Sequence, residues 1–214
     1  MAQSLKIDIV SDVVCPWCYV GYKQLETAAN QLGVELDITW QPFQLNPQMP
    51  EQGQNLREHI MEKYGSTAQE SADARARLQT IGEDLGITFN FADESRIYNT
   101  FACHVLLYWA EKYNKQHELK LALFEAYFSQ GKNISDLAIL MEILDSVGLD
   151  VAQAELALAD ESLQQRVQSQ ANTWTGHGIS SVPSMIIVDK YLVAGAQGVE
   201  NYVSIINQIL AEQA

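Results

Sequence analysis

The pattern of apolar and polar residues near the amino end predicts a strand, a helix and a second strand. Residues 5–10 read Leu-Lys-Ile-Asp-Ile-Val, and residues 35–41 alternate apolar and polar side chains. Such runs are typical of β-strands. Between them, apolar residues recur at helical spacing over residues 22–32, and Gly33 offers a helix stop. Because a helix joins the two strands, we expect a βαβ unit with parallel strands.

Helical periodicity then dominates residues 56–174. Thr67 and Glu70 have the spacing of a capping box, which predicts a helix that Gly86 closes. Further helices are expected over residues 95–113, over residues 119–128 with a stop near Gly131, and after starts at Ser135, Asp150 and Asp160.

The strand pattern returns near the carboxyl end. Residues 185–188 form a continuous apolar run, as in a central strand, and residues 191–195 are its expected antiparallel partner. An amphipathic helix follows over residues 199–210. Since the sheet-forming segments lie at both ends, we predict one domain made of residues 1–54 and 175–214. A helical domain of residues 55–174 would be inserted into it.

Composition narrows the possible partners. The chain has 214 residues and a net charge of -14, from 27 acidic and 13 basic side chains. Such a charge favours solubility and repels phosphate backbones and anionic lipids, so we expect no nucleic-acid and no membrane partner. Residues 1–8 lack the features of a signal peptide, and no run approaches the roughly 18 apolar residues of a membrane span. We therefore expect a cytoplasmic protein.

Two cysteines, Cys15 and Cys18, stand where the first strand passes into the first helix. Pro16, between them, suits the first turn of a helix. The helix amino terminus favours an anion, so we predict that the pKa of Cys15 lies below that of a free cysteine. The spacing also lets Cys18 fold back towards Cys15, so that the pair can open and close a disulfide.

Other uses of this cysteine pair are less consistent with the sequence. A structural zinc site needs four ligands, but Cys103 is the only other cysteine and no second Cys-x-x-Cys exists. A purely structural disulfide over two residues would close almost no loop. Redox chemistry is therefore the leading interpretation, and Cys103 is expected to be a buried packing residue.

Several motifs spread along the chain match one known family. They are Ser11 to Gly21 (SDVVCPWCYVG), Phe43 to Pro47 (FQLNP), Arg96, Asn99-Thr100, His104, Gly178 to Pro183 (GISSVP) and Gly195 to Gln197 (GAQ). Together with the strand and helix order, they resemble the DsbA-like branch of the thioredoxin superfamily, and within it the FrnE-like proteins. The resemblance implies an α/β, thioredoxin-like fold (βαβ…ββα) with a large all-helical insertion.

The resemblance also implies a function and roles for the site residues. The protein would be a thiol:disulfide oxidoreductase or isomerase that acts through a mixed disulfide. Cys15 would be the nucleophile and Cys18 the resolving cysteine. Substrate-binding positions would be Pro16 and Trp17 at the rim, with Val182 and Pro183 as a cis-proline site opposite the cysteines.

A second group of residues has supporting roles in this interpretation. Asn99 and His104 lie in a polar stripe, expected on one helix with Arg96, that would face the active site in the family. A structural hydrogen-bonding role is an equal alternative for this stripe. Asp12 would either assist proton transfer or cap the first helix. His177 is expected to be an exposed loop residue.

The redox pair itself carries the electrons, so we expect no bound cofactor and no metal, with glutathione kept open as a co-substrate. Partners would be protein or small-molecule thiols and disulfides, and the oligomeric state stays open. One alternative is a glutathione-dependent isomerase or transferase resembling the kappa class and hydroxychromene carboxylate isomerases, which typically carry serine at the position of Cys15. Another is a non-enzymatic peptide-binding chaperone.

Overall fold

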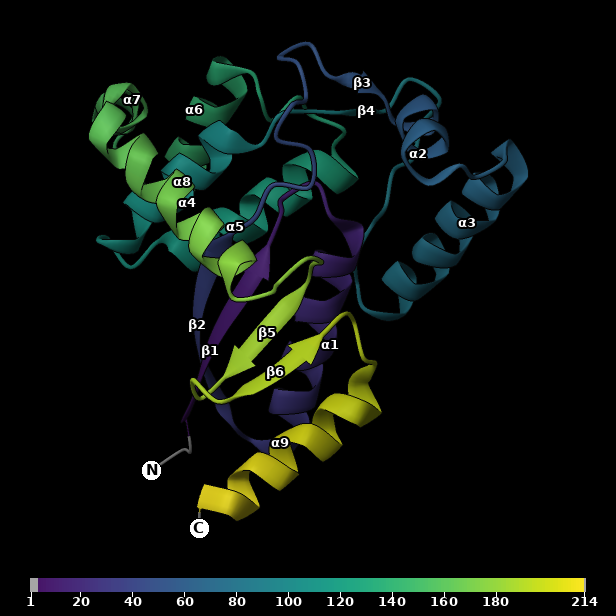
Figure 1. Ribbon diagram of the computed structural model, residues 1–214, viewed down its shortest axis with the longest axis vertical. Coiled ribbons are helices and arrows are strands. Elements are labelled where there is room, and N and C mark those ends of the chain that lie inside the picture. The colour runs from purple at the N-terminus through teal and green to yellow at the C-terminus, as the bar shows by residue number, and fades with distance from the viewer. Residues whose placement is uncertain (1–3, 214) are drawn as a thin grey trace.

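A computed structural model describes residues 4–213 and is organised around a four-stranded sheet in the order β2-β1-β5-β6 (Figure 1). The strands are β1 (Ser4–Ser11), β2 (Glu35–Pro42), β5 (Ser184–Ile187) and β6 (Tyr191–Ala194). β1 runs parallel to β2 and antiparallel to β5, and β5 is antiparallel to β6. The predicted βαβ unit and antiparallel carboxyl-terminal pair are thus confirmed.

Helix α1 (Pro16–Leu32) follows β1 directly, and helix α9 (Val199–Gln213) packs against it. α1 ends as predicted at Gly33, whose backbone is left-handed with φ 65°. The central strand β1 contributes Leu5, Ile7 and Ile9, all 0% exposed, to the core. The turn that carries Cys15 follows directly after the carboxyl end of this buried strand.

The middle of the chain is mostly helical. Its helices are α2 (Leu56–Tyr64), α3 (Ala68–Asp84), α4 (Phe101–Glu111), α5 (Gln116–Phe124), the π-helix η1 (Glu125–Ser129), α6 (Leu137–Ser146), α7 (Val151–Ala159) and α8 (Glu161–Gly176). The capping box of Thr67 and Glu70 and the caps at Asp150 and Asp160 are present as predicted. Asp136, rather than Ser135, caps α6. α5 and α8 both pack against β2.

The helix predicted from residue 95 begins later than expected. Arg96–Ile97 forms the short strand β4, which pairs with β3 (Gln54–Asn55), and α4 starts only at Phe101. Long-range pairing thus overrides the local helical pattern. Arg96 and Asn99 consequently do not share a helix with His104, which corrects the expected polar stripe.

The two segments that we assigned to the interrupted domain supply the strands of the main sheet. The boundaries at residues 54 and 175 remain a prediction, and residues 1–3 and 214 of that domain lie outside the described residues. Within the described chain, no helix combines the length and the apolar character needed to cross a membrane.

Candidate active site

Cys15 stands at the amino terminus of α1 as its N-cap residue, and Pro16 occupies the first helical turn. The turn is closed by two backbone hydrogen bonds, from the N–H of Cys15 to the carbonyl of Asp12 (3.2 Å) and from the N–H of Cys18 to the carbonyl of Cys15 (3.1 Å). Both cysteines are free thiols. Cys15 is 4% exposed and Cys18 is 0% exposed, so Cys18 lies deeper than Cys15.

The pKa values of the two thiols shift in opposite directions, and the shift of Cys15 differs from the sequence-based prediction. The side-chain interaction with Cys18, followed by burial, raises the pKa of Cys15 well above its ordinary value. Burial alone would raise the pKa of Cys18, but the hydrogen bond from Cys15 and the charge of Lys120 outweigh it and lower that pKa. The Cys15 side chain makes no capping hydrogen bond to α1. These directions favour Cys18 over Cys15 as the more acidic thiol of the pair.

Val182 and Pro183 lie beside the cysteines. The Cys15 Sγ atom is 3.7 Å from the carbonyl oxygen of Val182, and the Val182–Pro183 peptide bond is cis. The following strand, β5, pairs with β1 and thereby fixes this segment next to the turn. Gly21 makes room for the proline, because a Cβ atom there would lie 3.1 Å from the Cγ atom of Pro183.

Asp12 and His104 form a buried pair behind the cysteine turn. The Asp12 Oδ1 and His104 Nε2 atoms are 3.3 Å apart, and the Asp12 Oδ2 atom accepts a hydrogen bond from the N–H of Leu45 at 2.7 Å. Burial opposes ionisation of Asp12, but the hydrogen bonds and charge of its partners outweigh burial and lower its pKa. Asp12 is therefore not a cap of α1; it joins the cysteine turn to α4 and to the loop after β2.

The side chains of Asn99 and Arg96 form hydrogen bonds with backbone groups. Asn99 donates to the carbonyl of Met49 (2.9 Å) and accepts from the N–H of Phe101 (2.9 Å), at the start of α4. Arg96 donates to the carbonyl oxygens of Gln52 and Gly53. His177 is exposed at the carboxyl end of α8, as expected.

Cys103 is a packing residue, as predicted from its helical position. It is 0% exposed, and its Sγ atom lies 3.3 Å from the carbonyl oxygen of Ile134. Burial raises its pKa to about 12. A thiol of that acidity is hardly ionised at neutral pH, so Cys103 is a poor nucleophile.

A cavity of about 750 Å³ opens beside Cys15. Cys15, Pro16, Trp17 and Val182 form one side of it; α2, α3 and residues 43–46 contribute to the other walls. Trp17 is 38% exposed. The sequence analysis did not foresee this cavity, because its walls come from segments far apart along the chain.

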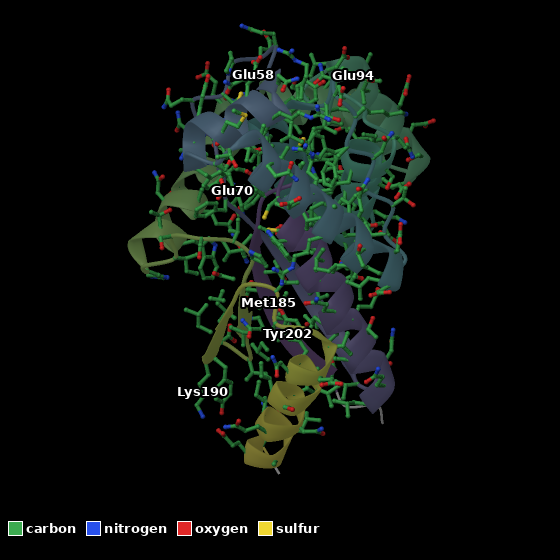
Figure 2. The ribbon with its side chains drawn as sticks, turned by 90° about the vertical axis from the view of Figure 1, so that its right-hand side faces the viewer. Glu58, Glu70, Glu94, Met185, Lys190 and Tyr202 are labelled. Atoms are coloured by element: carbon green, nitrogen blue, oxygen red, sulfur yellow. The ribbon has the colours of Figure 1, made fainter. Side chains whose placement is uncertain are left out.

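The charged side chains that line this cavity are all basic. Lys63, Arg75 and Arg96 line it together with His59, whose pKa burial lowers, and none of the lining residues is an aspartate or a glutamate. Figure 2 shows Glu58, Glu70 and Glu94 around the helical part of the molecule, and none of the three lines the cavity. In a chain with 27 acidic side chains and 13 basic ones, this composition gives the cavity a local positive field.

Lys120 is a further site residue that the sequence reasoning missed. It is 0% exposed, on α5, and burial lowers its pKa to about 8. The available signal was a lysine between Leu119 and Leu121, in the otherwise apolar second half of the helix. That signal is weak, because lysines usually reach solvent from such positions.

Comparison with known proteins agrees with the resemblance seen in the sequence. The chain is 31% identical over 198 residues to YwbO of Bacillus subtilis, covering 92% of each protein. The structure superposes on a probable DsbA oxidoreductase from Streptomyces coelicolor with a TM-score of 0.89 and 25% identity, over 98% of this chain and 92% of that one. A cytosolic disulfide reductase, DsbM from Pseudomonas aeruginosa with GSH, shares the fold at a TM-score of 0.66 and 15% identity, over 97% and 100% of the two chains.

A family model identifies the wider family of this chain, and membership of its FrnE-like branch stays a prediction. Residues 6–207 match the model of the DSBA-like thioredoxin domain. With the thioredoxin-like sheet, the cysteine turn at the start of α1 and the helical insertion, the chain belongs to the DsbA-like thioredoxin family.

Proposed function

We propose that the protein is a thiol:disulfide oxidoreductase or isomerase in which Cys15 forms a mixed disulfide with the client and Cys18 resolves it. This proposal rests on the difference in accessibility between the two cysteine sulfur atoms. Cys15 lines the cavity, whereas Cys18 does not and is 0% exposed. A client thiol or disulfide that enters the cavity therefore meets Cys15 first.

Electron flow begins when Cys15 ionises. During reduction of a client, the proton of Cys15 passes to the Cys18 thiolate, and the Cys15 thiolate attacks one client sulfur. The client disulfide breaks, and its other sulfur leaves as a thiolate. Cys18 then gives its proton to the released client thiolate and attacks Cys15, which forms the Cys15–Cys18 disulfide and releases the second client sulfur as a thiolate. The client gains the two electrons that the pair loses.

Val182 would help to hold an extended client. Its carbonyl lies close to Cys15, in the segment that leads into β5. Main-chain pairing with such a segment tolerates many client side chains. This arrangement supports broad specificity, with Pro16 and Trp17 contributing contacts at the rim.

The test compares single cysteine variants in insulin reduction and in exchange with a disulfide-bonded peptide. We expect Cys15→Ser to abolish exchange and Cys18→Ser to accumulate mixed disulfides, detected as a mass increase that a reductant removes. Cys103→Ala is the matched control and should exchange at the wild-type rate. Undiminished exchange by Cys15→Ser would overturn the proposal.

A second candidate, turnover of small anionic thiols such as glutathione, is favoured by the charges of the cavity. Lys63, Arg75 and Arg96 have no carboxylate within 4.0 Å among the described residues. Lys63 and Arg96 donate to backbone carbonyl oxygens and Arg75 donates to the hydroxyl of Ser71, so their positive charges are not neutralised and can attract a carboxylate of a ligand. Cysteine rather than serine at position 15 still favours redox exchange over glutathione-dependent isomerisation. Comparing glutathione disulfide with a disulfide-bonded protein as substrates separates the two candidates.

The chaperone alternative makes a different prediction. A peptide-binding chaperone would suppress aggregation of an unfolded client even after both Cys15 and Cys18 are replaced by serine. We expect that double variant to lose activity in refolding assays that require disulfide exchange. We place the protein in the cytoplasm, in keeping with the cytosolic DsbM that shares its fold.

A further inference from the structure

His59 of α2 lines the cavity beside Cys15, and both of its ring nitrogens face oxygen atoms. Its Nδ1 atom lies 2.8 Å from the Oε1 atom of Gln54, and its Nε2 atom lies 3.0 Å from the Oδ1 atom of Asn46. Gln54 belongs to β3, and Asn46 belongs to the loop after β2. The imidazole is therefore held between two segments outside its own helix.

The orientation of both amide groups is fixed by a second partner of known polarity. The Nε2 group of Gln54 donates to the carboxylate of Glu62 at 2.7 Å, so the amide oxygen of Gln54 is the atom that faces His59. The Lys63 ammonium donates to the Oδ1 atom of Asn46 at 2.6 Å, which places that oxygen towards the ring as well. An ionised carboxylate only accepts and an ammonium only donates, so turning either amide over would oppose like groups.

Two oxygen acceptors suit the imidazolium form of His59 better than its neutral form. A neutral imidazole donates from one nitrogen only, and the lone pair of its other nitrogen would face an oxygen atom at 2.8 or 3.0 Å. An imidazolium donates from both nitrogens. Protonation therefore completes the hydrogen bonding of the ring without a rearrangement of its neighbours.

The charges near His59 decide where along the pH scale it gains this proton. Helix α2 packs against α3, β3 and β4. The ionisable groups that share the hydrogen-bond network or the cavity of His59 are Glu62, Lys63 and Tyr64 of α2, Arg75 of α3, Arg96 of β4, and Cys15 before α1. Burial, followed by the charge of Lys63, lowers the pKa of His59, and the charge of Glu62 raises it by less. The ring therefore gains its proton on the acid side of the ordinary value of 6.5.

We propose that His59 is a protonation-dependent binding residue for anionic thiols and disulfides in the cavity. The inference rests on the proposed function, because these ligands are the small anionic substrates of that same site. His59 and Lys63 share the Oδ1 atom of Asn46, so protonation places two positive charges side by side in a cavity lined by no aspartate or glutamate. An anionic ligand and the proton on His59 then stabilise each other, and binding is accompanied by proton uptake.

A first test uses the unmodified protein and S-methylglutathione, an anionic ligand whose sulfur cannot exchange. The imidazole signals of His59 are followed against pH by NMR, with and without this ligand. We expect the midpoint of His59 to lie below 6.5 in the free protein. Saturating ligand should raise it by about one unit, a roughly tenfold gain in proton affinity. An unchanged midpoint with ligand bound would overturn the proposal, and so would the absence of binding at pH 5.5.

A second test compares His59→Gln with His177→Gln, which replaces an exposed histidine outside the cavity. The affinity for S-methylglutathione is measured by calorimetry at pH 5.5 and at pH 7.5. We expect the wild-type protein and His177→Gln to bind about fivefold more tightly at the lower pH, and His59→Gln to bind equally at both. The same pH dependence in all three proteins would contradict the proposal.

The outcomes also separate this inference from the proposed function, because S-methylglutathione reports binding without exchange. If disulfide exchange is intact but the His59 midpoint does not respond to the ligand, only the role of His59 fails. If the midpoint responds but no disulfide is turned over, the proposed function fails and the anion-binding role stands. If His59→Gln does not fold, the NMR titration of the wild-type protein decides.

Discussion

The Nε2 atom of His104 lies 3.3 Å from the Oδ1 atom of Asp12, although 92 residues separate the two along the chain. Both side chains are almost fully buried, at 2% and 1% exposed. Asp12 belongs to the turn that carries Cys15, and His104 belongs to α4 of the helical segment. This contact ties the helical segment to the redox turn.

Asp12→Asn should destabilise the protein by about 1–3 kcal/mol at neutral pH, because charge-assisted hydrogen bonds are lost in the interior. The folded pKa of Asp12 lies below its usual value of 3.8. Its contribution to stability is therefore present above that value and is lost as the pH falls through the folded pKa. Urea unfolding at several pH values should show the difference from wild type shrinking in acid.

The control for this variant is Asp37→Asn, which removes the same charge from an exposed strand position. It should change stability by no more than about 0.5 kcal/mol. A wild-type advantage over Asp12→Asn that is independent of pH would show that the carboxylate charge is not the source of the stability.

Cys18→Ser should lower the pKa of Cys15. The main cause of the raised Cys15 pKa is its hydrogen bond to Cys18, followed by burial. Serine in place of Cys18 removes the neighbouring thiolate, so ionising Cys15 no longer places two negative charges together. Thiolate absorbance against pH in a Cys103→Ala background would measure this. An unchanged Cys15 pKa would indicate that burial alone raises it.

Arg75→Gln should weaken the use of anionic small disulfides. Arg75 lines the cavity, and its NH1 group donates to the hydroxyl of Ser71 (2.8 Å) without a carboxylate partner within 4.0 Å in the described chain. We expect KM for glutathione disulfide to rise by about three- to tenfold, while a neutral disulfide keeps its KM.

Arg77→Gln on the same helix is the matched control, because Arg77 is exposed and does not line the cavity. Arg77→Gln should leave KM unchanged for both glutathione disulfide and the neutral disulfide. Equal rises in KM for the anionic and the neutral disulfide would argue against a charge effect at Arg75.

Cys103→Ala should leave the exchange rate unchanged and lower the free energy of unfolding by about 1–2 kcal/mol, through a small cavity and a lost contact with Ile134. Rates and urea unfolding measured on the same preparation check both parts. A large rate loss without a change in stability would make Cys103 part of the chemistry.

Local patterns in the sequence determined much of the fold. Strand alternation, the helix caps at Asp150 and Asp160 and the stop at Gly33 depend on neighbouring residues, and the structure contains them. The place of Cys15 at the start of α1 follows from the same local order of strand, proline and helix. These features could be predicted because their causes lie within one or two turns of chain.

Only the tertiary structure decided how distant residues meet. The sequence does not show that His104 would reach Asp12 or that Lys120 would be buried. Nor does it show that Arg75 would line a cavity beside Cys15, because each of these depends on how helices dock on the sheet. The direction of the Cys15 and Cys18 pKa shifts depends on that docking as well. Burial and long-range charge set those values, and a pattern of neighbouring residues contains neither.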